Sequence, residues 1–191
     1  MESITLRFAT PADAGALLGI YAPYIKTSVT FETEAPTLSE FQRRILGTVG
    51  MFPYLVAQQG ADIVGYGYAG RYGQRAAYRW NAELSLYLRQ DMRGHGLGKQ
   101  LYAALIELVR MQGFRHAYAV VVLPNPASEH LQAAFGFEQV AVFRNAGYKC
   151  AAWRDVAHYR KQLNPLGSPP PEIIPIPQLD QRAVNRVLAM E

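Results

Sequence analysis

A glycine-rich turn between Leu88 and Leu97 carries the residue types best suited to bind a charged ligand. Gly94, Gly96 and Gly98 leave the backbone accessible, and glycine tolerates the positive φ angles that tight loops need. The leucine spacing that follows predicts a helix, whose first turn has unpaired N–H groups at the positive end of its dipole. The turn therefore predicts an anion site, and a phosphate is its most natural occupant.

Three known glycine-loop patterns compete for this turn. A P-loop needs glycine where Arg93 stands and Ser or Thr where Gln100 stands. A dinucleotide-binding fingerprint needs glycine or alanine where Lys99 stands. The third pattern, Arg-x-x-Gly-x-Gly, is matched by Arg93, Gly96 and Gly98. A tight strand-to-helix turn without any ligand is the alternative.

One carboxylate, Glu83, stands directly before the apolar run that leads into this turn. A general base near neutral pH has to remove a proton from an ammonium group. Apolar neighbours such as Trp80, Ala82 and Leu84 would raise the pKa of the Glu83 carboxyl toward that range. Glu83 is therefore the candidate general base, and a solvated or salt-bridged strand carboxylate is the alternative.

Length and composition limit the classes of protein to consider. With 191 residues, half of them apolar, and a net charge of +4, the chain is one domain or one domain with an appendage. The longest apolar run, 117–123, is too short to cross a membrane, and the N-terminus does not have the pattern of a signal peptide. The scattered basic residues do not indicate nucleic-acid binding. The single cysteine, Cys150, fits a reducing, cytoplasmic location.

Hydrophobic periodicity and turn residues predict a mixed α/β chain. We expect strands at 5–8, 54–57, 63–68, 84–88, 117–123, 137–143 and about 149–159. We expect helices after Thr10, after Thr37, after the glycine turn, and from Ser128 to Ala134. The nearly continuous apolar run at 117–123 favours a strand buried on both faces. From residue 164 a proline-rich linker and a small helix over 178–190 are expected, so 1–163 form the domain and 164–191 an extension.

Several separate motifs share their order with one enzyme family. Besides the glycine turn, they are Ile20–Tyr24, Thr27–Glu32, Asn125–Ser128 with Gly136–Phe137, and Gly147–Lys149 with Trp153–Asp155. Together they resemble the phosphinothricin and methionine sulfone/sulfoximine branch of the GNAT superfamily of N-acetyltransferases. The resemblance covers roughly residues 3 to 163. It implies a mixed, mostly antiparallel sheet flanked by helices, with acetyl-CoA as co-substrate.

The resemblance assigns cofactor contacts to the turn and the strand before it. Backbone N–H groups would hold the pyrophosphate, and the strand edge would pair with the pantetheine arm and donate to the thioester oxygen. Asn125 would lie beside that arm, with Ser128 opening the next helix, where a simple N-cap is the alternative. The cofactor-binding candidates are Leu86, Tyr87, Leu88, Arg93, Gly94, His95, Gly96, Leu97, Gly98, Lys99, Asn125 and Ser128.

The resemblance places the acceptor in an early loop, after the third strand, and beside Glu83. The planar fork of arginine suits an amino acid's carboxylate, and Arg79 matches the family arginine best, with Arg75 second. Tyr72 and Leu84 depart from the tryptophan and histidine of some relatives. The substrate-binding candidates are Phe31, Glu32, Tyr72, Gly73, Gln74, Arg75, Tyr78, Arg79, Leu84 and Ser85.

The implied reaction is direct acetyl transfer to the α-amine of a small amino-acid-like substrate of the phosphinothricin, methionine sulfone or methionine sulfoximine type. Glu83 would be the base, and no metal is expected. The position that often holds a tyrosine or histidine acid in the family is Gln132, so the general acid stays open. Peptide or protein N-acetylation, and a non-catalytic acyl-CoA-binding module, are the alternatives.

A homodimer is expected as well. The branch commonly forms two-fold dimers, and the region 137–159 holds more aromatic residues than one edge hairpin usually needs for its own core. The proline-linked tail could reach across to the partner. The alternative is that these aromatic residues fill the monomer's core and the tail is loose.

Overall fold

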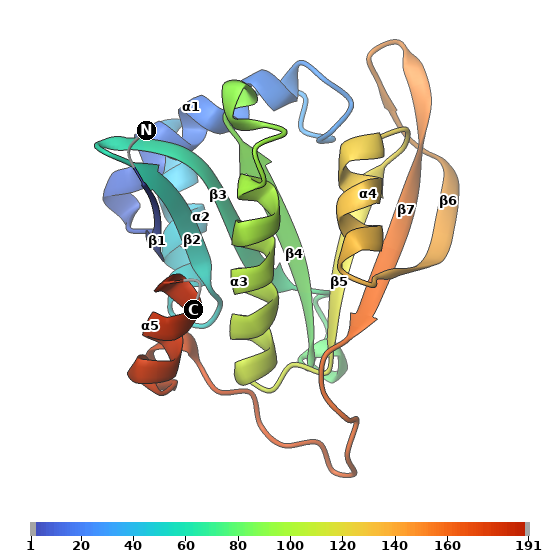
Figure 1. The fold of residues 1–191 in the computed structure, drawn as a ribbon. Coiled ribbons are helices and arrows are strands. Elements are labelled where there is room, and N and C mark those ends of the chain that lie inside the picture. Colours follow the sequence, from blue (N-terminus) through green and yellow to red (C-terminus); the bar gives the residue numbers. More distant parts are fainter. Residues whose placement is uncertain (1–2, 190–191) are drawn as a thin grey trace.

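A seven-stranded sheet in the order β1-β2-β3-β4-β5-β7-β6 forms the centre of the computed structural model, which describes residues 3–189 (Figure 1). Every neighbouring pair is antiparallel except β4 and β5, which run parallel. The predicted mixed, mostly antiparallel sheet is therefore confirmed. The strands are β1 Ile4–Phe8, β2 Tyr54–Gln59, β3 Asp62–Arg71, β4 Asn81–Leu88, β5 His116–Val122, β6 Glu138–Lys149 and β7 Ala152–Gln162.

Helices cover both faces of the sheet, α1 and α2 on one side and α3, α4 and α5 on the other (Figure 1). Their N-termini follow the predicted signals. The N–H of Thr10 donates to Asp13 at 2.7 Å before α1, and Thr37 and Glu40 form a reciprocal capping box before α2. The helices are α1 Ala14–Ile25, α2 Leu38–Val49, α3 Leu97–Met111, α4 Pro126–Ala134 and α5 Gln181–Ala189.

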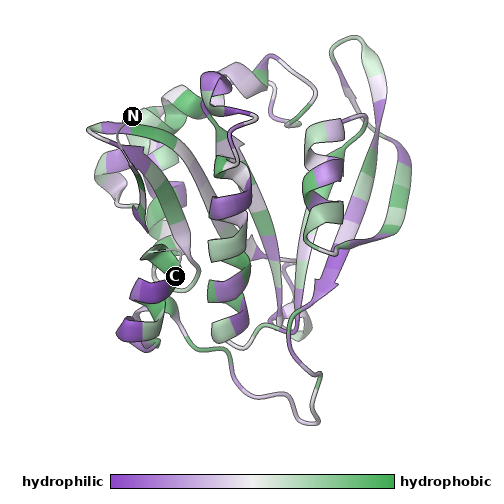
Figure 2. Cartoon of the chain, viewed as in Figure 1, coloured by the Kyte–Doolittle hydropathy of each residue, from purple (hydrophilic) through white to green (hydrophobic). Residues whose placement is uncertain are grey.

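Strand alternation divides the core into two layers. In β2, Leu55 and Ala57 pack with α3, whereas Tyr54 and Val56 pack with α1 and α2. Figure 2 shows hydrophobic residues along the central strands and hydrophilic ones on the outward turns of α3 and α5. The same alternation in β4 sends its even-numbered leucines toward α3 and its odd-numbered side chains toward α1 and α2.

The parallel pair β4–β5 is short. Its register covers residues 81–83 opposite 116–118, and beyond these the two strands separate (Figure 1). Within residues 3–189, β4 from Leu84 onward and β5 from Ala119 onward have no strand partner on the edges that face each other, although β5 stays paired with β7 on its other edge. The separation leaves backbone hydrogen-bonding groups of β4 available in the middle of the molecule.

Three local predictions were wrong. The strand β5 is not buried on both faces, because it borders the separation from β4 and Val120 is 40% exposed there. The helix α4 begins at Pro126, so Asn125 is the N-cap and Ser128 lies inside the first turn. The strand expected to start near Lys149 starts at Ala152, because β6 runs through Lys149 and the hairpin turns at 150–151, both with positive φ.

The C-terminal extension packs against its own chain, where the sequence favoured a loose tail or one reaching a partner. Ile174 N–H donates to Gln112 C=O at 2.9 Å, and Ile176, Leu179 and Val184 are buried in the cluster around α3. The expected small helix is α5, and Met190 lies outside the described residues. No helix within residues 3–189 is both long and apolar enough to cross a membrane.

Candidate active site

The glycine turn forms a row of unpaired backbone donors at the N-terminus of α3. Gly94 and Gly96 have φ of 82° and 83°, and Gly96 is the helix N-cap. Lys99 and Gln100 donate to the Gly96 carbonyl, whereas within residues 3–189 no acceptor faces the five N–H groups from Gly94 to Gly98. Five free donors at the positive end of a 15-residue helix are suited to a pyrophosphate.

Arg93, just before these glycines, is held from the other face of the sheet. Its guanidinium lies 4.9 Å from the centre of the Tyr24 ring in α1. The Tyr24 hydroxyl donates to the Leu88 carbonyl at 2.6 Å and accepts from the Leu88 N–H at 3.0 Å. The first helix therefore fixes both the last residue of β4 and the arginine of the turn.

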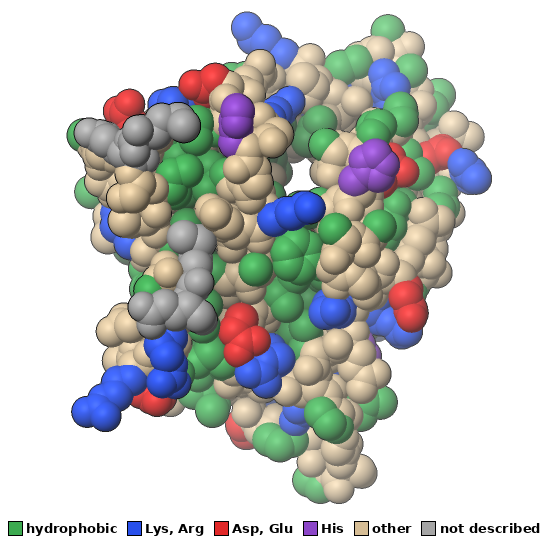
Figure 3. All heavy atoms as spheres, in the orientation of Figure 1, with side chains coloured by type: hydrophobic (Ala, Val, Ile, Leu, Met, Phe, Trp, Pro, Cys, Tyr) green, Lys and Arg blue, Asp and Glu red, His purple; other side chains and the backbone are tan. Residues whose placement is uncertain are grey.

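The separation between β4 and β5 contains a cavity of about 90 Å³. Leu84–Tyr87 of β4 and Ala119–Val121 of β5 form two of its walls. Asn125, the residues Ser128, Leu131 and Gln132 of α4, and Tyr102 of α3 complete the lining. Figure 3 shows an opening through the molecule between the glycine turn and α4, so that ligands can approach from both faces of the sheet.

On the free edge of β4, the backbone N–H and C=O of Leu86 are the groups that remain open to a ligand. Arg89 N–H donates to Val64 C=O in β3, so by alternation the N–H and C=O of Leu88 and Leu86 point to the opposite edge. The hydroxyl of Tyr24 already hydrogen-bonds to the N–H and C=O of Leu88. The predicted edge Leu86–Leu88 therefore offers the backbone groups of Leu86 to a ligand in the cavity, while Tyr87 points its ring toward α1.

Glu83 lies where β4 and β5 are still paired, opposite Tyr118. The carboxyl is half-buried, and desolvation raises its pKa above the ordinary value. Tyr72 stacks on Tyr118 with ring centres 3.8 Å apart, which brings the loop after β3 to the same place. A carboxylate with a raised pKa, one residue before the cavity-lining part of β4, is suited to accept a proton near neutral pH.

Asn125 and Ser128 meet at the start of α4. Asn125 Oδ1 accepts from the Ser128 N–H at 3.2 Å, and Asn125 N–H donates to Glu129 at 2.9 Å. Asn125 is therefore the N-cap, the role that was the alternative for Ser128. Both residues line the cavity beside β4.

The loop over residues 27–32 is held in place by residues 147–149 of β6. Lys149 is buried and its Nζ donates to the carbonyls of Thr30 and Glu32 at 2.5 and 2.6 Å. A Cβ at Gly147 would lie 2.5 Å from the Phe31 ring, so glycine is required for that contact. The motifs at 27–32 and 147–149 thus pack together into one wall of the candidate site. The carboxylate of Glu32 is separately engaged, in an ion pair with Arg44 at 2.6 Å.

The loop 72–79 brings only some of its candidates toward Glu83. Tyr72 reaches Tyr118, and Tyr78 packs against Tyr72 and over Gly73, whose φ is 77°. Arg79 turns to the C-terminal extension, where it pairs with Glu172 at 3.0 Å and lies 4.2 Å from the Trp80 ring. The side chains of Gln74 and Arg75 are exposed, and within residues 3–189 no hydrogen bond or ion pair holds them, although the Arg75 carbonyl accepts from the Tyr78 N–H.

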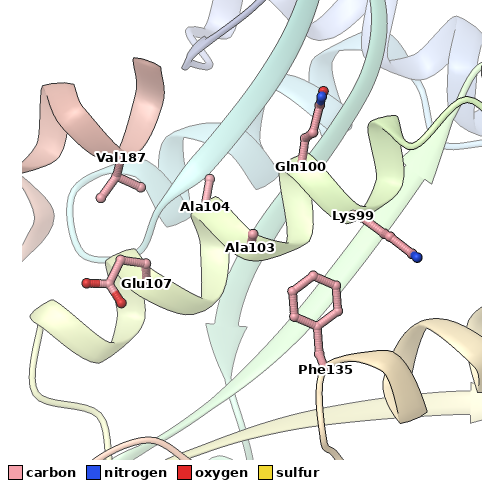
Figure 4. A pocket seen from close by; sticks show the side chains of 7 residues that line it. All are labelled: Lys99, Gln100, Ala103, Ala104, Glu107, Phe135 and Val187. Carbon is pink, nitrogen blue, oxygen red and sulfur yellow. The ribbon is translucent and has the colours of Figure 1, made fainter. Parts of the chain in front are cut away.

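A larger cavity of about 460 Å³ lies on the outer face of α3. In Figure 4 the Phe135 ring rises from the end of α4 toward Lys99, and Val187 of α5 lies near Glu107 at the opposite end. Lys99 follows directly on the five free N–H groups, so this cavity continues from the anion site along α3.

Sequence reasoning missed three residues of the site. Tyr102 donates to Gln132 at 2.8 Å inside the small cavity, but in the sequence it is one more apolar position of α3. Tyr24 and Lys149 occurred in motifs that were recognised, yet no local signal showed what their side chains contact. Within residues 3–189, no group of three His, Cys, Asp or Glu side chains could hold a metal.

Comparisons with known proteins agree with this geometry. Residues 6–157 match the family described as acetyltransferase (GNAT) domain. The phosphinothricin N-acetyltransferase of Streptomyces viridochromogenes is 35% identical over 177 residues, 92% of this chain and 96% of that protein. The L-methionine sulfoximine/L-methionine sulfone acetyltransferase of Pseudomonas aeruginosa is 32% identical, over 88% of this chain and 99% of that protein.

Solved structures show the same fold. The crystal structure of a GNAT superfamily phosphinothricin acetyltransferase from Sinorhizobium meliloti, in complex with AcCoA, has a TM-score of 0.81 and 34% identity. The match covers 84% of this chain and 89% of that one. The resemblance proposed from the sequence motifs is therefore confirmed, and the chain belongs to the GNAT acetyltransferase family.

Proposed function

We propose that this protein transfers the acetyl group of acetyl-CoA directly to the α-amine of a small amino-acid-like acceptor. The observation that carries the proposal is the separation of β4 from β5. It leaves the Leu86 backbone open in a cavity that β4 lines from Leu84 to Tyr87, and along the chain Glu83 directly precedes this stretch and the anion-binding turn follows it.

The turn would hold the pyrophosphate through the free N–H groups of residues 94–98. The pantetheine arm would then add to β4 at Leu86 as a short pseudo-strand, with Asn125 and Ser128 on its other side. A backbone N–H of this edge would donate to the thioester oxygen as negative charge develops on it. Arg93, His95 and Lys99 add positive or polar groups around the phosphates.

Glu83 would take the proton from the acceptor's ammonium, directly or through water. Its side chain points to the face of α1 and α2, whereas the leucines of β4 point to α3. The acceptor amine would therefore attack from the face opposite the helix that begins the phosphate site. Loss of the amine proton and departure of the CoA thiolate complete the exchange of a thioester for an amide.

The acceptor would lie between the 27–32 wall and the 72–79 loop. Phe31, Tyr72 and Tyr78 would surround its side chain, and Ser85 and Leu84 of β4 would form the floor. The names of the relatives, phosphinothricin and methionine sulfoximine or sulfone acetyltransferases, point to acceptors that carry an α-carboxylate. Arg75 is the free guanidinium for it, since Glu172 holds Arg79.

A panel of free amino acids and analogues, with acetyl-CoA and detection of released thiol, tests the function. We expect transfer to phosphinothricin or to methionine sulfone or sulfoximine, and much less to N-terminal peptides. Transfer to peptides alone would support the peptide alternative. Binding of acetyl-CoA without transfer to any amine would support a non-catalytic module.

We also propose that the protein is a homodimer, formed through the β6–β7 hairpin. Phe143, Tyr148 and Trp153 are between 54% and 61% exposed on this hairpin, whereas Phe137 and Tyr159 belong to the monomer's core. Light scattering at micromolar concentration should give a dimer, and replacement of Tyr148 and Trp153 by serine should give a monomer. The exposed single thiol of Cys150 is consistent with a reducing, cytoplasmic location.

A further inference from the structure

The proposed reaction needs a proton for the departing thiolate, and the residue at the position expected to supply it is Gln132. A carboxamide does not give up a proton near neutral pH. Gln132 is 4% exposed, lines the small cavity, and accepts a 2.8 Å hydrogen bond from the phenol of Tyr102. The phenol is therefore the nearest acidic proton in contact with Gln132.

The phenol of Tyr102 lies on a different face of the sheet from that of Tyr87, the other tyrosine in the cavity wall. Tyr87 points its ring toward α1, where it packs edge-on against Tyr21 and Tyr24 at 4.9 and 5.2 Å. Tyr102 lies on the α3 side, in one cluster with Leu84 of β4 and Ala119 of β5. It thus occupies the face from which the pantetheine arm would enter.

The proposed base and the tyrosine phenol lie on different faces of the sheet. Glu83 lies on the α1–α2 face, where the amine would arrive, and Tyr102 lies on the α3–α4 face. In acetyl transfer the attacking nitrogen and the departing sulfur occupy different sides of the reacting carbon. A base on one face and an acid on the other suit this arrangement.

We propose that the Tyr102 phenol protonates the departing CoA thiolate and that Gln132 positions it. The inference rests on the proposed function. As the amide bond forms, the carbon–sulfur bond breaks, its electron pair stays on sulfur, and the phenol proton moves to that sulfur. The attacking nitrogen gives its second proton to solvent as the amide forms, and the phenolate regains one from solvent, so the reaction releases one net proton, the one that Glu83 takes from the ammonium.

Gln132 suits this cycle because a carboxamide has both an acceptor and a donor end. Its Oε1 accepts from the phenol before transfer, and within residues 3–189 no acceptor holds its Nε2. The Nε2 group is therefore available to donate to the phenolate after transfer. A leucine at this position would fill similar space without either role.

Tyr102→Phe is the decisive variant, because the ring that packs at 5.3 Å from Phe135 is kept. Tyr159→Phe is its matched control, since Tyr159 is also buried and donates to a glutamine, Gln139, but does not line the cavity. We expect Tyr102→Phe to lower kcat by about 10²-fold with little change in KM for acetyl-CoA. The control should retain wild-type kcat.

A second measurement needs no turnover. CoA labelled with carbon-13 on the methylene beside its sulfur reports ionisation of the bound thiol by NMR. A phenol that donates to the thiolate lowers the pKa of that thiol, so Tyr102→Phe should raise the midpoint by about one to two pH units. Equal midpoints in wild type and Tyr102→Phe would overturn the assignment. Absence of acetyl transfer by the wild type would refute the proposed function instead, and the titration would still decide the role of Tyr102.

Discussion

The proposed cofactor side and the proposed acceptor side of the site are built in different ways. The cofactor side consists mainly of backbone groups within one stretch of chain, from the β4 edge through the turn to the first residues of α3, with Asn125 and Ser128 added from the start of α4. The acceptor side is assembled from segments more than a hundred residues apart, as Lys149 shows by holding Thr30 and Glu32. Local sequence can therefore specify the first, whereas the second depends on the complete fold.

The difference also suggests how each side tolerates change. Backbone N–H groups are present whatever the side chains, provided that the glycine φ angles are available. The acceptor wall depends on single contacts, such as the fit of Phe31 over Gly147. We therefore expect cofactor binding to be sensitive at a few glycines and acceptor choice to be sensitive at many side chains.

Glu83→Gln tests the proposed base on the acceptor side, and we expect the largest effect from it. The change keeps the shape and removes the base, so kcat/KM at neutral pH should fall by about 10²–10⁴-fold. Calorimetric binding of acetyl-CoA should stay intact. Full activity in this variant would remove Glu83 from the mechanism.

The pH dependence gives this prediction a second readout. Burial raises the pKa of Glu83, so the wild type should lose kcat/KM as the pH falls through that raised value, where the protonated carboxyl cannot accept a proton. The variant should lack this limb. Its deficit should shrink as the pH rises, because more of the acceptor amine is then already neutral. A uniform deficit at all pH values would indicate a positioning role.

Gly96→Val tests the cofactor side alone. At φ 83° any side chain is strained, and a β-branched one most of all, so the loop has to rearrange and lose its free N–H groups. We expect the Kd for acetyl-CoA to rise by roughly 10- to 100-fold, in line with about 1–3 kcal/mol for such strain.

Gly98→Ala is the matched control in the same turn. Gly98 is not in the positive-φ region, and a Cβ there would meet Leu88 and Leu86 at 3.4 and 3.5 Å, which is ordinary contact. Its effect on the Kd should be several times smaller. Equal losses in both variants would mean that bulk, and not backbone conformation, governs this loop.

Most of the fold could be predicted from the sequence because its signals are local. The Thr37–Glu40 capping box, the leucine spacing of α3 and the glycine turn each act over a few residues, and all three are confirmed. The boundaries near 126 and 149 were wrong, because the Asn125 cap and the hairpin turn at 150–151 compete with equally plausible local alternatives.

The site was less predictable for the same physical reason. Nothing near Arg79 indicates that a glutamate 93 residues later will pair with it. Tyr102 looks like a core residue until α4 places Gln132 opposite its hydroxyl. These contacts are set by how the sheet brings distant segments together.

The two candidate arginines provide a test of the acceptor side. We expect Arg75→Ala to raise the acceptor's KM by about tenfold or more, because one charge-assisted pair is lost. Arg79→Ala should raise it less, because Arg79 already pairs with Glu172. The KM for acetyl-CoA should change in neither variant. The reverse order would mean that the acceptor displaces Glu172 from Arg79, and Glu172→Gln should then lower the acceptor's KM.

The smallest predicted effect concerns the start of α1, the helix whose Tyr24 contacts Leu88 and Arg93. Arg7 donates two hydrogen bonds to Asp13, at 2.7 and 2.8 Å, and lowers the pKa of that carboxyl from 3.8 to about 2. A carboxyl with a lowered pKa in the folded state stabilises the protein above its unfolded pKa. That stability is lost as the pH falls from about 3.8 toward 2.

Asp13→Asn should therefore lower the free energy of unfolding at neutral pH by about 1–2 kcal/mol, a value reduced for the solvent screening of a partly exposed Arg7. The difference between variant and wild type should vanish near pH 2, where wild-type Asp13 becomes protonated. Urea unfolding at both pH values measures it. The ion pair lies outside the cofactor turn, so the Kd for acetyl-CoA at neutral pH should not change. A higher Kd in Asp13→Asn would show that the start of α1 and the cofactor turn are coupled through Tyr24 and Leu88.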